Sequence, residues 1–528
     1  MRAVHVLGSA LLVVVAAGLA SAALAPEGPA ELPRATVDTG LAAASGRTVT
    51  VPAGGDLQAA LDRAQPGDVI ALEAGGVYVG PFTLPRKTGS SEWITVRTSA
   101  PDGALPPGRR VGPSDAAAMA KLVSGSGSVL STAPGAHHYR LVGLEIRPRD
   151  GVFLTNLVDL GTDAAMDMPH HLIVDRCYLH GDPKKGARRG IALNARDAAV
   201  IDSYLFDFKE GGADSQAIAG WSGPGPFKVV NNYLEAAGEN LLFGGADPPT
   251  ADLVPADIEI RRNHLAKPLA WKAGEHGHEG TAWTVKNLLE LKNARRVLIE
   301  GNLLEYNWPQ AQNGFAILFT VRNQGGRAPW SVIEDVTFVG NVLRHSAAGI
   351  NILGRDDIHS SRPARRIVIR NNLFEDLGGP RWGGSGILFQ LLNGAAQVVI
   401  EHNTALQTGN IIMAEGRPHE GFVFRANIAP HNLYGIIGAG TGSGSVTLER
   451  HFPRAVVEHN VIAGAGANRY PRNNSFPASL EDVGFADRDR GDYRLADKSR
   501  YRRTAGGRDP GADWALVEAA RGIASPAR

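Results

Sequence analysis

The stretches IEIRRNHL (258–265) and VLIEGNLL (297–304) carry the pattern that decides the fold. Each has two apolar residues one position apart, then a polar turn that ends in Asn, then an apolar residue two positions beyond the Asn. Ten segments share this pattern, with Cys177, Ser203, Asn232, Asn263, Asn302, Asn341, Asn372, Asn403, Asn427 and Asn460 at the Asn position. Successive copies lie 24 to 39 residues apart. A repeat of this length with a variable remainder predicts a solenoid with loops of unequal size.

The recurring Asn has a physical reason in a parallel β-solenoid. Each coil stacks on the next at about 4.7–4.9 Å, so one corner residue lies directly above its equivalents. An amide both donates and accepts hydrogen bonds, which allows a continuous ladder along the stack. Asn also tolerates the left-handed backbone of a tight corner. The flanking apolar residues alternate with polar ones, so we expect strands with one inward and one outward face.

The chain resembles the right-handed parallel β-helix proteins of the pectate-lyase-like superfamily. The resemblance covers residues 47–500 and lies in the repeat and its end caps, while no family-specific catalytic signature matches. Leucine-rich repeats also carry one Asn per repeat, but their L-x-x-L-x-L signature is missing and the β-branched content favours strands. We therefore expect an all-β fold, a right-handed parallel β-helix with an N-terminal capping helix and an Asn ladder.

The ends of the chain differ from the repeat. Residues 1–22 have a basic start, an apolar run and a small-residue cleavage site, which predicts a signal peptide and a secreted or periplasmic protein. Residues 23–46 are rich in Pro, Ala and Gly and are interpreted as a linker. We assign 47–508 to one β-helix domain that begins with a capping helix after Asp56, and 509–528 to a C-terminal tail.

Composition limits the partners. The chain has 54 Lys plus Arg against 53 Asp plus Glu, a balance that argues against nucleic acid and membrane surfaces as partners. The only cysteine, Cys177, excludes an intramolecular disulfide and falls in the ladder column, where burial is the expected role. A disulfide-free exported protein suits a bacterial export route. Caps at both ends favour a monomer.

A second strand column precedes each Asn strand, with members such as NLLELKN (287–293) and GFAILFTVRN (314–323). In the family, the corresponding sheet lines the substrate groove. If the Leu and Ile side chains face inward, a stripe of acids and bases faces outward or lies in the following turn. The stripe contains Glu239, Asp247, Lys286, Glu290, Lys292, Arg322, Asn323, Arg355, Asp356 and Asp357. Stacking brings these groups into neighbouring rows, which makes a candidate site.

Tryptophan is concentrated beside this stripe. Six of the eight tryptophans lie between residues 221 and 382, and two coils there have 39 residues each. Flat apolar rings beside polar groups suit sugar faces, so Trp221, Trp283, Trp308 and Trp330 are candidate saccharide-binding residues. Packing of the rings under their own loops is the equally weighted alternative.

These groups can be assigned to a polysaccharide lyase acting on a uronate-containing glycan. Such an enzyme removes the proton next to the carboxyl group and expels the 4-linked oxygen, with Lys292 or Lys286 as candidate bases. Arg322 and Arg355 would bind the substrate carboxylate, together with Asn323. Possible Ca²⁺ ligands are Glu239, Asp247 and Glu290.

Three alternatives remain open. The stripe can be a solvated ladder of salt bridges without chemistry, which is favoured for any single residue. A polygalacturonase-like hydrolase would use the paired carboxylates Asp356 and Asp357, although GRDDIH lacks the rest of that signature. A non-catalytic carbohydrate-binding solenoid would hold a glycan without cleaving it.

Overall fold

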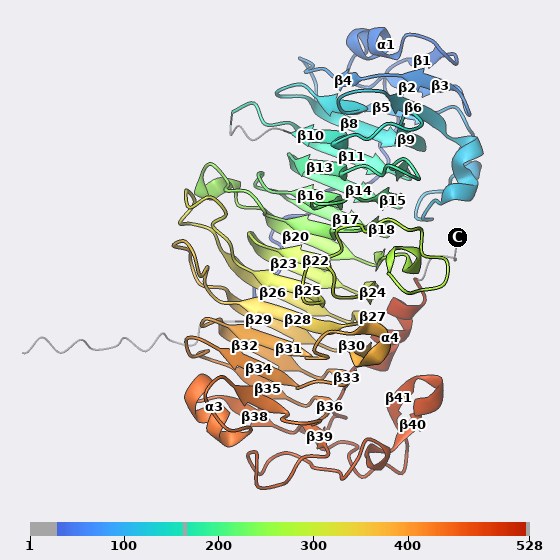
Figure 1. Ribbon diagram of the computed structural model, residues 1–528. Helices are drawn as coiled ribbons and strands as arrows, with labels where there is room; N and C mark the ends of the chain where they lie inside the picture. Colours follow the sequence, from blue (N-terminus) through green and yellow to red (C-terminus); the bar gives the residue numbers. More distant parts are fainter. Residues whose placement is uncertain (1–28, 162–165, 524–528) are drawn as a thin grey trace, which may run out of the picture.

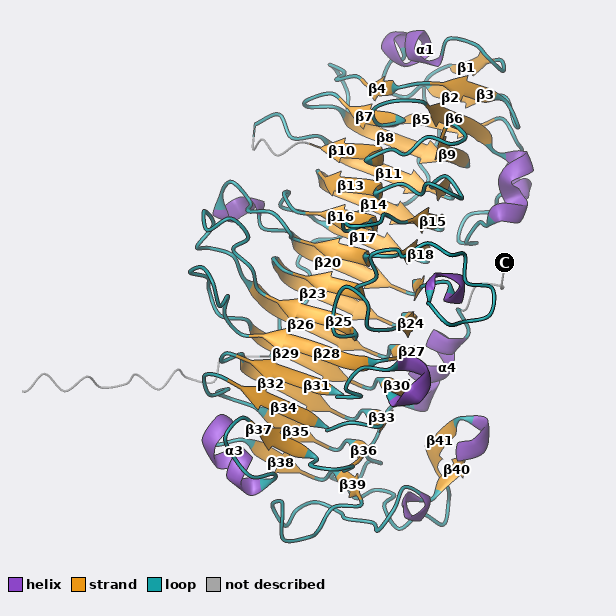
Figure 2. Cartoon of the chain, viewed as in Figure 1, coloured by secondary structure: helices purple, strands orange, loops and turns teal. Residues whose placement is uncertain are grey.

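The computed structural model describes residues 29–161 and 166–523, and within them the chain forms one elongated right-handed parallel β-helix. Three long parallel sheets run the length of the shaft, and most coils contribute one strand to each sheet (Figure 1). Helices are few and lie at the ends and on the side of the shaft (Figure 2). The fold expected from the repeat is confirmed. The predicted signal peptide lies outside the described residues.

The 14-stranded sheet consists of β1 (Thr48–Val51), β2 (Val69–Leu72), β5 (Ile94–Thr98), β8 (His137–Val142), β11 (His170–Asp175), β14 (Arg196–Ile201), β17 (Phe227–Val230), β20 (Ala256–Arg261), β23 (Ala294–Glu300), β26 (Ile333–Val339), β29 (Arg365–Arg370), β32 (Ala396–Glu401), β35 (Val423–Arg425) and β38 (Val456–Glu458). The 12-stranded sheet consists of β4 (Phe82–Leu84), β7 (Leu130–Thr132), β10 (Asn156–Gly161), β13 (Arg189–Asn194), β16 (Gln216–Gly220), β19 (Glu239–Phe243), β22 (Asn287–Leu291), β25 (Phe315–Thr320), β28 (Ala348–Leu353), β31 (Phe389–Leu392), β34 (Ile412–Glu415) and β37 (Ile436–Gly438).

The 13-stranded sheet consists of β3 (Val77–Val79), β6 (Ala120–Ser124), β9 (Leu144–Pro148), β12 (Tyr178–His180), β15 (Tyr204–Phe208), β18 (Tyr233–Ala236), β21 (His264–Ala266), β24 (Leu303–Asn307), β27 (Val342–Ser346), β30 (Leu373–Leu377), β33 (Thr404–Gln407), β36 (Ile428–Pro430) and β39 (Val461–Ala463). A short antiparallel pair, β40 (Phe485–Asp487) and β41 (Asp492–Leu495), follows the last coil. The helices are α1 (Leu57–Arg63), α2 (Gly379–Trp382), α3 (Ser445–His451) and α4 (Trp514–Arg521).

The core is a stack of inward side chains in register from coil to coil. Leu289 of β22 pairs with Ile317 of β25, which pairs with Ile350 of β28, and all three are fully buried. The alternate position on the same strands holds Glu290, Leu318 and Asn351, whose side chains therefore face outward. The 12-stranded sheet is the second strand column expected from the sequence, with the inward and outward positions as predicted.

The Asn ladder forms at the turn from the 14-stranded to the 13-stranded sheet. The Oδ1 atom of Asn302 accepts hydrogen bonds from the backbone N–H and the side-chain amide of Asn263, at 2.9 and 3.1 Å. Asn302 in turn donates to Asn341 of the next coil. The same pattern continues to Asn460, and Asn474 extends it by one step. Ser203 and Cys177 begin the ladder, and burial raises the pKa of the Cys177 thiol to about 12.

The N-terminal end is closed by α1, as expected. The Asp56 side chain accepts a hydrogen bond from the Ala59 N–H, which caps the helix, and Leu57 and Leu61 point into the core. At the other end, α3 covers the last coils of the shaft (Figure 1). Both open ends of the stacked sheets are thereby covered.

The described parts of the segments assigned as linker and tail pack on the shaft. Residues 29–46, which we call the N-terminal strap, run along the outer face of the 14-stranded sheet, where the Glu31 N–H donates to Asp335 and the carbonyl of Gly40 accepts from Arg140. Within the assigned tail, α4 places Val517 against Leu303, Val342 and Leu373 at the 13-stranded sheet. The linker and tail assignments describe composition, whereas the structure shows fixed contacts.

Candidate functional site

A groove of about 610 Å³ lies over the outer face of the 12-stranded sheet at β22, β25 and β28. Six of the side chains that sequence reasoning selected line this groove: Glu290, Lys292, Arg322, Asn323, Asp356 and Asp357. They come from three successive coils, which confirms that stacking brings these groups together. The lining carries two basic side chains against three carboxylates.

Glu290 forms the buried centre of the groove floor. It is 2% exposed, and its Oε2 accepts a hydrogen bond from the Asn287 side-chain amide at 3.1 Å. Its Oε1 accepts from Thr320 at 3.4 Å and lies 3.7 Å from the Lys292 ammonium. Since Lys292 is only 16% exposed, its ammonium is held beside this carboxylate and opens into the groove. The Lys292 ammonium and the Glu290 carboxylate thus lie side by side in the groove.

A second buried carboxylate, Glu239, lies one coil earlier. Its Oε2 accepts a hydrogen bond from Gln216 at 2.8 Å, whereas its buried Oε1 accepts none. Burial, followed by repulsion from Glu290 and Asp214, raises the pKa of Glu239 to about 7, against the attraction of Lys286 and Lys292. The group is therefore partly protonated near neutral pH.

Lys286 belongs to this second carboxylate rather than to the groove. Its ammonium donates to Asp214 and lies 3.4 Å from Oε1 of Glu239. Burial lowers the pKa of Lys286, but the Glu239 and Asp214 carboxylates outweigh it and the net pKa is raised. The depressed pKa that would make Lys286 a base is not found, and its role is to neutralise the two acids.

Arg322 bridges the groove to the pair of aspartates. Its Nη1 lies 3.3 Å from Oδ1 of Asp356 and also contacts Asp357. Asp356 is tied to the backbone, because Oδ2 accepts the Asn323 N–H at 2.7 Å and Oδ1 accepts the Ile358 N–H at 2.9 Å. Burial raises the pKa of Asp356, but these backbone bonds and Arg322 hold it below its usual value. Asp357 is the exposed member of the pair.

Two other predicted polar residues shape the turns around the groove. Both carboxylate oxygens of Asp247 accept the Gly325 N–H at 3.0 Å, and Oδ2 also accepts the Arg327 N–H. Asn323 donates to the Ser360 carbonyl and accepts from the Ala328 N–H. Each side chain is occupied by backbone groups, so it fixes a loop. Arg355 lies in the turn after β28, where its carbonyl accepts from Asn393.

The tryptophans follow the loop-packing alternative. Trp283 and Trp308 are 6% and 4% exposed and pack with Trp271 under the loop that follows β21. Their faces are covered, and they do not line the groove. Trp330 is half-buried and donates to the Pro248 carbonyl. Trp221 is half-buried, with the Arg189 guanidinium 5.3 Å from its ring centre. The expected saccharide-stacking rings are absent from the groove lining as the structure describes it.

The residues predicted to hold Ca²⁺ divide into two sets. Within the described residues, Glu239, Asp247 and Glu290 do not bring three ligand atoms within 4.8 Å of one another. Asp247 is occupied by the 325–327 loop. Glu239 and Glu290 remain together, and Asn287 lies between them with its own Oδ1 buried and without a hydrogen-bond partner. Asn287 Oδ1 and Glu239 Oε1 accept no hydrogen bond, although Lys286 forms an ion pair with the latter, and such buried oxygens fit a hard cation that prefers oxygen ligands.

Sequence reasoning named Glu239 but missed Gln216 and Asn287, which complete this floor. Both are paired in register with Glu239, on β16 and β22 either side of β19, so the three occupy one column. Aligning the strands by coil would have revealed that column. Asp214 comes from the turn before β16, where nothing in the repeat marks it.

No family model matches the sequence, and no curated protein matches it. Solved structures do match. The catalytic unit of a GH87 α-1,3-glucanase from Streptomyces thermodiastaticus is 15% identical with a TM-score of 0.51, over 84% of this chain and 71% of the glucanase. A PL6 family alginate lyase, AlyGC, is 14% identical with a TM-score of 0.49, over 86% of this chain and 57% of the lyase.

A mannuronic acid specific family 6 lyase from human gut microbiota is also 14% identical, with a TM-score of 0.45, over 90% of this chain and 99% of that one. At such low identities these matches show a similar fold and nothing more. The glucanase, with a TM-score of 0.51, is the match on which the similarity of fold rests. None of the helices in the described part of the chain has the length and apolar character to cross a lipid bilayer.

Proposed function

We propose that the protein is a polysaccharide lyase that cleaves a uronate-containing glycan by β-elimination. The observation that carries the proposal is the juxtaposition in one groove of Lys292, Arg322 and a floor of buried oxygen ligands beneath them. This arrangement supplies the two requirements of the reaction, a base for the proton next to the carboxyl group and positive charge for the carboxylate.

Lys292 is the proposed base. Its position at the groove wall lets the amine approach the C5 hydrogen of a bound uronate, while its aliphatic stem is held by the surrounding coil. The amine takes the C5 proton, the C5–H electron pair forms the C4–C5 double bond, and the C4–O bond breaks. The proton on Lys292 then passes to the leaving oxygen, which balances the step.

Arg322 is the proposed carboxylate-binding residue. It reaches the groove from the coil after Lys292, and its contacts with Asp356 and Asp357 hold its guanidinium in place. A planar guanidinium binds a carboxylate through two parallel hydrogen bonds. Arg322 would release the exposed Asp357 on binding substrate and keep Asp356, which the backbone fixes.

Glu239, Asn287 and Glu290 are the proposed ligands of a Ca²⁺ ion. When bound, the ion would neutralise the uronate carboxylate and stabilise the negative charge that develops at C5. The acidic excess of the groove lining supports this assignment, because an anionic polymer would otherwise be repelled. Lys286 borders the site and balances the charges of Glu239 and Asp214.

The geometry favours the lyase over the hydrolase alternative. A glycosidase needs one carboxyl group that donates a proton and one that remains ionised. Asp356 has a lowered pKa and both oxygens bonded to backbone N–H groups, so it lacks a free proton and a free oxygen. Glu239 has a suitably raised pKa but is fully buried, so a glycosidic oxygen cannot reach it.

The test is a screen of the purified protein on alginate, pectate, glycosaminoglycans and neutral glucans, each with Ca²⁺ and with a chelator. Ultraviolet absorbance of unsaturated uronates and new reducing ends are recorded together. A joint rise on one uronate polymer supports the lyase, and its loss with chelator supports the cation. Reducing ends without absorbance would contradict the lyase and support a hydrolase. Retention on a glycan without cleavage would support the carbohydrate-binding alternative.

We further infer an exported protein that acts as a monomer on an extracellular polysaccharide. The inference depends on the sequence of residues 1–22 and on the covered ends of the shaft.

A further inference from the structure

Four histidines form a compact array on the 14-stranded sheet, away from the groove on the 12-stranded sheet. His137 and His138 begin β8, and His170 and His171 begin β11. The two strands are hydrogen-bonded neighbours, with His137 directly opposite His170. The pair His137 and His138 therefore lies directly beside the pair His170 and His171 of the next coil.

The backbone directs all four rings to the same side. Successive residues of a strand normally point to opposite faces, but His138 and His171 have φ values of 55° and 52°. This left-handed conformation turns each ring back beside that of its predecessor. The rings of His137 and His170 stack with centres 5.0 Å apart, and those of His138 and His171 stack at 4.3 Å. The same position of later coils also has positive φ, at Asp197, Asp257, Arg296, Asp335, Arg366 and Gln397, so the conformation is a regular corner of the coil that here holds two histidines in register.

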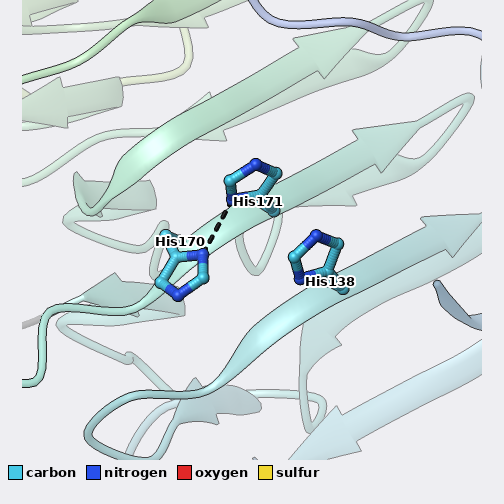
Figure 3. A group of neighbouring side chains, drawn as sticks. All are labelled: His138, His170 and His171. Carbon is cyan, nitrogen blue, oxygen red and sulfur yellow. Dashed lines mark hydrogen bonds between the residues drawn. The ribbon is translucent and has the colours of Figure 1, made fainter. Parts of the chain in front are cut away.

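The nitrogen atoms converge. His138, His170 and His171 each place one ring nitrogen within 4.8 Å of the other two (Figure 3). Among the described residues, no other group of three His, Cys, Asp or Glu side chains meets this distance. Figure 3 shows the three rings close together at the start of β8 and β11, with a dashed line between His170 and His171. The Nδ1 atoms of these two rings are 2.7 Å apart.

The hydrogen bonds around the array determine which ring nitrogen of His138 can bind a ligand. His137 Nε2 lies 3.1 Å from the Lys87 carbonyl and must donate to it, since a carbonyl only accepts. His137 Nδ1 then accepts from His138 Nδ1, 2.8 Å away, which leaves the Nε2 lone pair of His138 free.

The surroundings provide both a fourth ligand and access. Asp197 occupies the equivalent position on the next coil, with Oδ2 3.7 Å from His171 Nδ1. His171 and Asp197 line a hollow of about 460 Å³ beneath the N-terminal strap, together with Asp38. Arg196 lies opposite His170, where its positive charge would repel a metal cation. The negative charges of Asp38 and Asp197 offset that repulsion. Trp93 also lines the hollow and packs against His138, with ring centres 5.3 Å apart.

We propose that His138, His170 and His171 bind a divalent transition-metal ion of the Zn²⁺ class, with Asp197 or water as the fourth ligand. Zn²⁺ binds imidazole nitrogen at about 2.0–2.1 Å in a tetrahedral arrangement, which small rotations of the three rings supply. The ion would replace the contact between the Nδ1 atoms of His170 and His171. His137 would orient His138 from outside the ligand set, as hydrogen-bonded neighbours of metal ligands do.

This site differs in chemistry from the groove. Imidazole nitrogens select Zn²⁺, Ni²⁺ or Cu²⁺, whereas Ca²⁺ prefers oxygen ligands. The histidine site also lies on another sheet and on earlier coils than the groove. We therefore assign the ion a structural role, in which it links β8 to β11 below the N-terminal strap. Because the ion binds the folded chain, it should also raise the unfolding temperature.

The test begins with metal-free full-length protein and calorimetric titration with Zn²⁺, with Ca²⁺ as the comparison ion. We expect one Zn²⁺ per chain at the array. His170→Gln and His171→Gln should each weaken Zn²⁺ binding by at least about tenfold and abolish the rise in unfolding temperature. His345→Gln is the matched control, because His345 also has positive φ, stacks on an aromatic ring and is hydrogen-bonded. Binding should be unchanged in that variant.

Equal Zn²⁺ affinity in wild type, H170Q and H171Q, or no stoichiometric binding in wild type, would overturn the proposal and leave a stacked hydrogen-bonded array. If the variants fail to fold by circular dichroism, X-ray absorption of wild-type protein with one Zn²⁺ decides. Three imidazole ligands support the site, and fewer than three contradict it.

Discussion

The Lys292 ammonium lies 3.7 Å from Oε1 of Glu290, at the floor of a groove that Arg322 enters from the next coil. This ion pair can have either of two roles: it can stabilise the fold, or it can position the Lys292 amine for catalysis. The pair is largely buried, so replacing Lys292 leaves the Glu290 carboxylate without its cation. Arg322 is more exposed, and its partner Asp356 keeps its backbone hydrogen bonds. Loss of either basic group should lower turnover, and loss of Lys292 should also lower stability.

Lys292→Ala and Arg322→Ala should each lower turnover on the uronate polymer by about 10²–10⁴-fold, since one removes the base and the other the carboxylate contact. The unfolding temperature should fall in K292A, which leaves the buried Glu290 carboxylate without its cation, and change little in R322A. The measurement is initial rate from ultraviolet absorbance, paired with thermal unfolding. Arg327→Ala is the control, because Arg327 is near the groove and 86% exposed. Full activity in both K292A and R322A would exclude this assignment of roles.

The raised pKa of Glu239 predicts that the stability of the fold depends on pH. Its pKa is raised from 4.5 to about 7 in the folded chain. Between these values the folded state binds more protons than the unfolded state, so ionisation of Glu239 destabilises the fold as pH rises. Glu239→Gln cannot ionise. Its unfolding temperature relative to wild type should therefore increase between about pH 5 and pH 8, by roughly 2–4 °C. A difference that is constant with pH would show that Glu239 has an ordinary pKa.

The paired aspartates separate the lyase from the hydrolase. Asp357→Asn removes only an exposed partner of Arg322, so lyase activity should fall by less than about tenfold. Asp356→Asn should lower the unfolding temperature, because its carboxylate accepts the backbone N–H groups of the turn. Complete loss of product in D357N with an unchanged melting curve would favour a direct role for Asp357 and hence the hydrolase.

The centre of the Asn ladder should be its most sensitive part. Asn302→Ala removes the side-chain donor to the Ile260 carbonyl and the acceptor of the Asn263 backbone N–H inside the shaft, while the Asn263 side-chain amide keeps its bond to the Val229 carbonyl. We expect a loss of about 2–4 kcal/mol in the free energy of unfolding. Asn474→Ala, at the less buried end, should cost less because water can replace its contacts. Urea unfolding of the two variants provides the comparison, and equal losses would contradict it.

The fold was accessible from the sequence because its determinants repeat. Asn302 and Leu289 each have an equivalent on neighbouring coils, so a wrong assignment at one coil would conflict with the next. The ladder and the inward column are both confirmed. Asn474 escaped prediction because it follows the last coil without the apolar residues that mark the repeat.

The site was predictable only where the repeat places it. Glu290 and Lys292 follow from strand position, and Arg322 follows from the next turn. Asp247 and Trp283 lie in loops whose course the repeat does not determine. Asp247 instead holds the backbone of the 325–327 loop, and Trp283 packs beneath its own loop. The histidine array had a signal, since two His-His pairs lie at equivalent positions of successive coils.

The N-terminal strap has a consequence for the order of assembly. Each coil of the shaft contacts its immediate neighbours, whereas the Glu31 N–H bonds to Asp335, 304 residues later in the chain. The Arg34 N–H likewise bonds to Asp257 and the Lys228 ammonium to the Val37 carbonyl. These partners exist only after the coils up to β26 have formed, so the first described residues of the chain must be among the last to dock. A missing or misaligned coil would shift every partner by about 4.8 Å, and the strap would then fail to engage.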